Sequence, residues 1–210
     1  MMRVLIADDH PVVRRGVRQT LTDEFPECEI VEACTAGELM SLVRSGTWNV
    51  VILDISLPDR NGLDVLKELQ ADYPHLPVVV LSMHPEDQFA VRMMKAGASA
   101  YVTKESASED LTQAVRLALA RRRYMSPALT ERLALEAVLE DGSKTLVLSD
   151  REMQVLCLIA EGKNLTEISE VLILSVKTIS TYRARLLEKL KVKTNADLVH
   201  FAISHGYARK

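Results

Sequence analysis

Residues 4–13 read VLIADDHPVV, an apolar run that ends in two adjacent carboxylates, Asp8 and Asp9. The run VLIA is short and bounded by polar residues, which predicts a buried strand of a parallel sheet covered by helices on both faces. Ligands of open α/β sheets bind at the carboxyl ends of the strands, and two neighbouring carboxylates repel each other unless a cation or proton separates them. The stretch therefore predicts a fold class and a site. The alternative is a solvated pair that leads into the next helix.

The first 122 residues repeat this pattern of a strand followed by a helix five times. The predicted strands are residues 4–7, 29–33, 50–54, 77–82 and 99–103. The predicted helices are residues 11–24, 36–45, 62–72, 86–96 and 108–122. Right-handed crossovers arrange such an alternation as a doubly wound, five-stranded parallel sheet of the α/β class. Its carboxyl edge would carry Asp8, Asp9, Asp54, Ser82 and Lys104.

Three carboxylates, one hydroxyl and one ammonium at the same edge indicate phosphoryl chemistry. Asp54 can be the nucleophile, while Asp9 and Asp54 hold an oxygen-preferring cation such as Mg²⁺. Lys104 and Ser82 would then contact the phosphoryl oxygens. Each residue alone is weakly diagnostic, because polar residues at strand ends are usually just solvated. The prediction depends on the five residues together.

Length and composition set limits on the class of protein. A chain of 210 residues, 48% hydrophobic and 26% charged, can form one large domain or two small ones. No apolar stretch approaches the roughly 18 residues of a membrane span, and Asp8 comes too early for a signal peptide. We therefore expect a cytoplasmic protein with no membrane partner. The three cysteines lack C-x-x-C spacing, so we expect buried apolar residues and neither disulfides nor a zinc site.

Charge is distributed unevenly along the chain. The net charge is -5 over residues 1–122, -1 over 123–146 and +3 over 147–210. Residues 176–193 hold six Lys or Arg residues and only one acid, Glu188. A local basic surface of this kind attracts nucleic acid, although a solvated helix face is the simpler alternative. The basic run at 121–123 is expected to be an ordinary helix C-terminus.

The last third of the chain shows no strand pattern. Residues 123–146 are expected to be a linker with one helix over about 128–139. Capping-box spacing occurs at Ser149–Glu152 and Asn164–Glu167, and Ser175 can cap a third helix. We predict helices from Ser149 to Gly162, over 165–172 and over 176–190, and a last helix that follows Thr194-Asn195 and ends near residues 205–206. Two helices joined by a tight turn, the second one basic, are typical of a helix-turn-helix domain.

The predicted helix at 176–190 has two faces. Its apolar stripe, expected to face the core, consists of Val176, Ile179, Tyr182, Leu186 and Leu190. The opposite face carries Lys177, Ser180, Thr181, Ala184 and Arg185. A helix in the major groove needs short or hydrogen-bonding residues for base edges and cations for phosphates. We therefore predict that this face binds double-stranded DNA.

Residues 1–122 resemble the receiver domain of bacterial two-component response regulators, a CheY-like fold. The matching motifs are DD at 8–9, LDISLPDRNG at 53–62, LSMH at 81–84 and AGASAYVTK at 96–104. The resemblance implies that Asp54 is the phosphoacceptor, and that Mg²⁺ is held by Asp9, Asp54 and the backbone carbonyl of Ser56. It also implies that Asp8 assists directly or through water.

The resemblance further implies that Ser82 and Tyr101 form the switch pair.

Residues 147–207 resemble the LuxR-type effector domain of NarL/FixJ response regulators, through LSDRE at 148–152 and LSVKTI at 174–179. This resemblance implies that Lys177 and Thr178 contact DNA phosphates, while Ser180, Thr181 and Ala184 face the bases. Two positions depart from the family pattern, which usually has Gly at Ala100 and often a polar residue at Val171. Neither touches the predicted chemistry.

The expected function is a phosphorylation-controlled transcription regulator. Its partners would be a histidine kinase or phosphotransfer protein, promoter DNA and, after phosphorylation, a second copy of the chain. We do not expect the protein to be an enzyme. It would take phosphate onto its own Asp54 and would lose that phosphate slowly by autodephosphorylation. An aspartyl-phosphate phosphatase would have D-x-D after the first strand, and a dinucleotide-binding enzyme would have G-x-G-x-x-G there. A module that binds protein instead of DNA is the remaining alternative, disfavoured by the basic face.

Overall fold

The computed structural model describes residues 1–83, 86–127, 129–131, 134, 148–172 and 174–204. The chain divides into two compact units, residues 1–135 and 136–210. The predicted receiver limit at residue 122 and the start of the last domain at 147 stay predictions. Most of the predicted helix at 128–139, and the end of the last predicted helix, lie outside the described residues.

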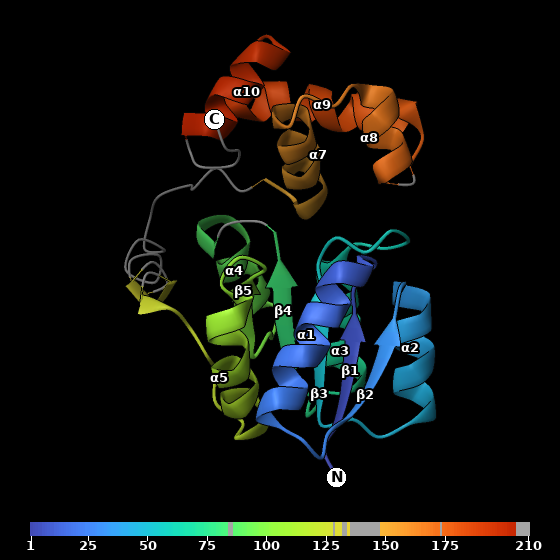
Figure 1. Ribbon diagram of the computed structural model, residues 1–210. Coiled ribbons are helices and arrows are strands. Elements are labelled where there is room, and N and C mark those ends of the chain that lie inside the picture. Colours follow the sequence, from blue (N-terminus) through green and yellow to red (C-terminus); the bar gives the residue numbers. More distant parts are fainter. Residues whose placement is uncertain (84–85, 128, 132–133, 135–147, 173, 205–210) are drawn as a thin grey trace. The chain divides into compact units, whose positions relative to one another are not determined.

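The first unit contains the predicted parallel sheet (Figure 1). Its strands are β1 (Arg3–Ala7), β2 (Glu29–Ala33), β3 (Val50–Asp54), β4 (Val78–Ser82) and β5 (Ala100–Thr103). They lie in the order β2-β1-β3-β4-β5, and every neighbouring pair is parallel. Every residue of β3 and β4 is buried, as expected for central strands covered on both faces. The predicted doubly wound fold is confirmed.

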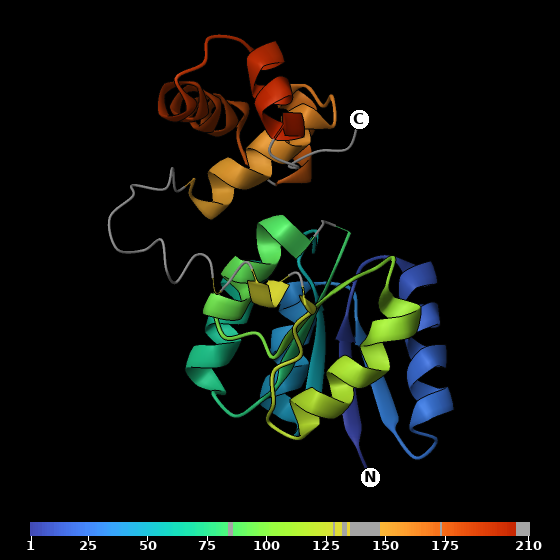
Figure 2. The ribbon, with the colours of Figure 1, turned by 90° about the vertical axis from the view of Figure 1, so that its left-hand side faces the viewer.

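Five helices cover the two faces of this sheet. They are α1 (Pro11–Glu24), α2 (Ala36–Ser45), α3 (Gly62–Asp72), α4 (Glu86–Lys95) and α5 (Ala107–Leu119). Figure 2 shows α1 and α5 on one face and α2, α3 and α4 on the other. The apolar sides of α1 and α5 bury Val17, Leu21, Leu111 and Val115 against the sheet. With both faces covered, only the strand ends remain for a polar site.

The loop after β3 is held tightly next to Asp54. A Cβ at Gly62 would lie 2.3 Å from Ile55 Cα, so only glycine lets α3 begin this close to the strand exit. The side chain of Asn61 caps α3 by accepting a hydrogen bond from Leu63 N at 2.8 Å. Asp59 accepts hydrogen bonds from the backbone of Ala36 and Gly37, at 2.8 and 2.9 Å. These contacts fix the backbone around the predicted phosphoacceptor.

The second unit is helical among its described residues. It consists of α7 (Asp150–Ala160), α8 (Leu165–Val171), α9 (Val176–Leu190) and α10 (Asn195–Ser204). Both predicted capping boxes are present, and Ser175 caps α9 by accepting from Thr178 N at 3.1 Å. Gly162, past the end of α7, has a φ of +84°, which glycine adopts without strain. The helical class predicted for this domain is confirmed.

Several local predictions were wrong. The helix predicted over 108–122 ends at Leu119, because Arg121 adopts a left-handed φ of 58°. Val176 is 44% exposed, because the buried side of α9 begins one turn later at Ile179. Cys157 is buried, but Cys34 lies exposed in the loop after β2. No helix among the described residues is long and apolar enough to cross a membrane.

Candidate functional site

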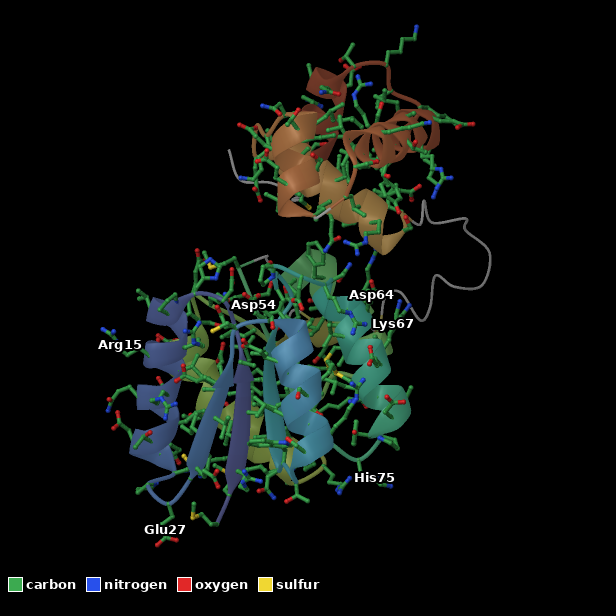
Figure 3. The ribbon with its side chains drawn as sticks, turned by 90° about the vertical axis from the view of Figure 1, so that its right-hand side faces the viewer. Arg15, Glu27, Asp54, Asp64, Lys67 and His75 are labelled. Carbon is green, nitrogen blue, oxygen red and sulfur yellow. The ribbon has the colours of Figure 1, made fainter. Side chains whose placement is uncertain are left out.

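The carboxyl edge of the sheet gathers the predicted acidic residues. Asp8 and Asp9 directly follow β1, and Asp54 ends β3, which is hydrogen-bonded to β1. In Figure 3 Asp54 lies at one end of the sheet, and His75 lies at the other. The side chains of Asp8 and Asp54 are 1% exposed, while that of Asp9 is 34% exposed. The structure therefore places two buried carboxylates beside a third that solvent reaches.

Lys104 lies between the two buried carboxylates. Its Nζ donates a hydrogen bond to Asp54 Oδ2 at 2.7 Å and lies 2.7 Å from Asp8 Oδ2. Its position just after β5 is fixed by its own backbone N–H, which donates to the carbonyl oxygen of Ser82 at 2.7 Å. One ammonium group is thus paired with two buried carboxylates, so the three side chains together carry a net negative charge.

Burial and charge shift the acid–base behaviour of this pair. Burial raises the pKa of the Asp54 carboxyl, against the opposing attraction of Lys104, and the nearby charge of Asp8 raises it further. Burial alone would lower the pKa of Lys104, but the charges of Asp54 and Asp8 outweigh it and raise that pKa. Lys104 therefore stays charged, and Asp54 would gain from additional positive charge nearby.

A divalent cation fits this need. Asp8 Oδ2 and Asp9 Oδ1 are buried and accept no hydrogen bond of good geometry within the described residues. Ligand atoms of Asp8, Asp9, His10 and Asp54 all lie within 4.8 Å of one another. Carboxylate oxygens are the ligands that hard cations prefer. The acidic pocket is thus consistent with binding of a divalent metal ion.

The loop after β3 contributes one contact to this pocket. Ser56 N–H donates a hydrogen bond to Asp54 Oδ1 at 3.0 Å, which orients the carboxylate. The proposed role of the Ser56 carbonyl as a metal ligand stays a prediction. Ser56 itself is exposed.

His10 is a member of the pocket that the sequence analysis missed. Its Nδ1 lies 2.7 Å from Asp9 Oδ1 and 3.2 Å from Asp8 Oδ1, and its backbone N–H donates to Asp8 Oδ1 at 2.7 Å. Arg14 adds a further contact, because its Nη1 donates to the Asp8 carbonyl oxygen at 2.7 Å. The position of His10, directly after the two acids, was the signal that could have revealed it.

The predicted switch residues lie near the pocket on the next two strands. Asp54 pairs in register with Leu81, so Ser82 lies one residue further toward the carboxyl edge. Tyr101 on β5 pairs with Val80, and both Ser82 and Tyr101 are fully buried. The side chains are thus enclosed within the receiver rather than solvated at its surface. Their role as a switch stays a prediction.

The exposed face of α9 is where the sequence analysis placed it. The predicted DNA-contacting residues that are exposed are Lys177, Ser180, Thr181, Ala184 and Arg185, while Thr178 is half-buried. The hydroxyls of Ser175 and Thr178 lie 2.8 Å apart at the helix start. Thr181 Oγ1 donates to the Lys177 carbonyl at 3.0 Å, which fixes its rotamer and leaves its oxygen free to accept.

One contact that holds α9 in place was also missed. Lys189 Nζ on α9 donates a hydrogen bond to Glu152 Oε2 on α7 at 2.6 Å, and Glu152 is 2% exposed. Burial would raise the pKa of Glu152, but the bonds from Lys189 and Ser149 outweigh it and lower that pKa. In the middle of α9, Arg183 Nε donates at 2.5 Å to Oδ1 of Asn195, which begins α10. Both contacts orient the exposed face of α9.

Comparison with known families gives two matches within the chain. Residues 4–116 match the model described as "Response regulator receiver domain", and residues 146–202 match "Bacterial regulatory proteins, luxR family". The chain is 36% identical over 209 residues to the response regulator GacA of Pseudomonas aeruginosa, covering 98% of this chain and 97% of GacA. It is 31% identical over 208 residues to the response regulator UvrY of Escherichia coli, covering 98% of this chain and 95% of UvrY.

Solved structures give the same assignment. RcsB from Salmonella enterica serovar Typhimurium, bound to promoter P1flhDC with the phosphomimetic BeF3-, is 30% identical and has a TM-score of 0.68. That match covers 97% of this chain and 98% of the RcsB chain. A second RcsB structure, bound to promoter rprA, is 29% identical with a TM-score of 0.67, covering 97% of this chain and 100% of that chain. A further structure contains two RcsB dimers bound to two parallel DNAs.

Proposed function

The chain belongs to the response regulators that join a receiver domain to a LuxR-type DNA-binding domain, and on this premise we propose that phosphorylation of Asp54 controls promoter binding. The observation that carries the proposal is the contact between Asp54 and Lys104. A buried carboxylate at the carboxyl edge of the sheet has a fixed ammonium 2.7 Å away. This pair can orient a transferred phosphoryl group and balance its charge.

The phosphoryl donor is the phosphohistidine of a kinase or phosphotransfer protein, or a small acyl phosphate. One carboxylate oxygen of Asp54 bonds to phosphorus as the bond from phosphorus to the donor nitrogen or oxygen breaks, and the donor leaves with that electron pair. Lys104 stabilises charge on the equatorial oxygens, and Ser56 N–H orients the carboxylate. Mg²⁺ held by Asp9, Asp54 and the Ser56 carbonyl, with Asp8 directly or through water, would neutralise further charge.

The receiver acts here on itself and is not an enzyme with a separate substrate. Asp54 is consumed as the acceptor, and the phosphoryl group then leaves slowly by hydrolysis. The chain would work in the cytoplasm, where promoter DNA lies. Its output is a change of state and not a released product.

The change of state passes from the receiver to DNA. A phosphoryl group shifts a two-state equilibrium only through contacts that differ between the states, and the buried Ser82 and Tyr101 are placed to make them. Phosphorylation would promote a homodimer or alter contacts between the domains. The RcsB structures support this proposal, because they hold dimers, promoter DNA and a phosphomimetic.

On DNA the exposed face of α9 enters the major groove. Lys177, Thr178 and Arg185 would contact phosphates, while Ser180, Thr181 and Ala184 face base edges. A symmetric dimer places two such helices on half-sites about one helical turn apart. The protein-binding alternative is disfavoured because this face combines cations with short polar side chains.

The test is phosphate incorporation from acetyl phosphate with Mg²⁺, followed by intact-protein mass spectrometry. We expect wild type to gain one phosphoryl group and Asp54→Asn to gain none. Asp64→Asn is the matched control, because Asp64 is exposed on α3 near the same face of the receiver (Figure 3) and should be labelled like wild type. Full labelling of Asp54→Asn would refute the assignment of the acceptor.

A further inference from the structure

We propose that His10 is a nitrogen ligand of the cation site, so that this receiver favours transition-metal ions such as Mn²⁺ and Co²⁺ more than an all-oxygen site would. The proposal rests on the metal site of the proposed function and adds the class of ion. Imidazole suits transition metals, whereas Mg²⁺ prefers oxygen and keeps its waters. One histidine therefore changes selectivity between ions.

The interatomic distances fit a shared ion. In an octahedral shell with bonds of about 2.1 Å, neighbouring ligand atoms lie about 3.0 Å apart and opposite ones about 4.2 Å apart. His10 Nδ1 lies 3.2 Å from Asp8 Oδ1, 2.7 Å from Asp9 Oδ1 and 4.0 Å from Asp54 Oδ2. Each distance is within about 0.3 Å of an octahedral value. The contact with Asp9 must change most, and the Asp9 side chain is partly exposed and can move.

The imidazole can bind an ion without the loss of a hydrogen bond that caps α1. His10 is the N-cap of α1, yet its side chain makes no capping hydrogen bond, and Pro11 at the helix start presets the backbone. The ring is 58% exposed, so it reaches the site from the solvent side, whereas Lys104 is only 5% exposed. The carboxylates of Asp8, Asp9 and Asp54, whose ligand atoms lie within 4.8 Å of one another and of a His10 ring nitrogen, complete the ligand set.

The experiment is titration calorimetry of the full chain with Co²⁺ and with Mg²⁺, supported by the visible absorption spectrum of bound Co²⁺. The spectrum reports exchange of a nitrogen for an oxygen ligand. We expect His10→Ala to lower the ratio of Co²⁺ to Mg²⁺ affinity about tenfold and to change the Co²⁺ spectrum. His75→Ala is the matched control, because His75 is exposed at the other end of the sheet (Figure 3) and should leave both unchanged.

Three results would overturn the proposal. The ratio could stay unchanged in His10→Ala; both ions could bind more tightly by the same factor, as expected of a mere counter-ion; or His75→Ala could lower the ratio as much. Asp9→Asn separates this from the proposed function. If Asp9→Asn weakens neither ion, the acidic site itself is refuted. If it weakens both while His10→Ala leaves the ratio unchanged, only the role of His10 fails.

Discussion

The two candidate sites of this chain place their charges in opposite ways. At the sheet edge Asp8, Asp54 and Lys104 are buried, and Lys104 Nζ lies 2.7 Å from each of the two carboxylates. On α9 the charged side chains Lys177 and Arg185 are exposed. Buried charges depend on each other, since removal of one partner leaves the other desolvated. Exposed charges act almost independently, so substitutions on α9 should change DNA binding and leave stability nearly unaltered.

The sharpest contrast comes from the removal of one ammonium group in each region. Lys104→Met should lower the free energy of unfolding of the receiver by about 3 kcal/mol, because Asp8 and Asp54 lose the ammonium group that they share. Lys177→Met should change it by less than about 0.5 kcal/mol. Urea unfolding of both variants without divalent ions measures this difference. Equal losses would show that the charges at the sheet edge are not coupled as their distances indicate.

Thr181 should be the most sequence-selective position of α9. Its side chain is short, exposed, central in the helix and held by the Lys177 carbonyl. Thr181→Ala should cost about 1 to 3 kcal/mol of binding at one or two base positions and little on random DNA. Competition binding against single-base operator variants provides the measurement. A uniform loss across all sequences would reverse the assignment of Thr181 to base reading.

Glu152 should link the stability of the helical unit to pH. Its folded pKa is lowered, so its stabilising effect is present above the ordinary pKa of a glutamate and is lost as pH falls through the folded value. Because Lys189 is 42% exposed, the contribution is modest, about 1 kcal/mol. Glu152→Gln should lose this amount at pH 7 and less at pH 3.5. Thermal melts at both pH values test it, and an equal loss at both would contradict the sign.

Lys177 should show the smallest effect, spread evenly over all DNA. Lys177→Ala removes one phosphate contact, which should reduce the slope of log affinity against log salt concentration by about one unit. Fluorescence anisotropy over a series of salt concentrations measures the slope on operator and on random DNA. A loss confined to one base pair would move Lys177 from positioning to base reading.

The same contrast explains what the sequence could predict. Strand bounds agreed within one residue, because the apolar runs are short, buried and bounded by turn residues. The acids, Ser82 and Lys104 were found because parallel topology brings strand ends together. His10 directly follows the two acids in the sequence, but the 2.7 Å contact of its ring with Asp9 Oδ1 was known only from the structure. Glu152 and Lys189 are 37 residues apart, so their contact needed the packed structure.

The exposure of side chains at helix ends was harder to predict. Val176 belongs to the apolar stripe by periodicity, yet it is exposed because the core of the helical unit does not extend to the first turn of α9. The end of α5 was predicted wrongly because Arg121 adopts a left-handed conformation, although no glycine stands there to indicate a helix end. Periodicity therefore predicts the orientation of a helix better than the extent of its burial.

We propose that phosphorylation of Asp54 controls the binding of DNA by α9. The most direct measurement is the affinity of the full chain for its operator, by anisotropy, with and without acetyl phosphate and Mg²⁺. Wild type should bind more tightly after phosphorylation, and Asp54→Asn should show its basal affinity under both conditions. An equal gain in Asp54→Asn, or no gain in a fully phosphorylated wild type, would contradict the account.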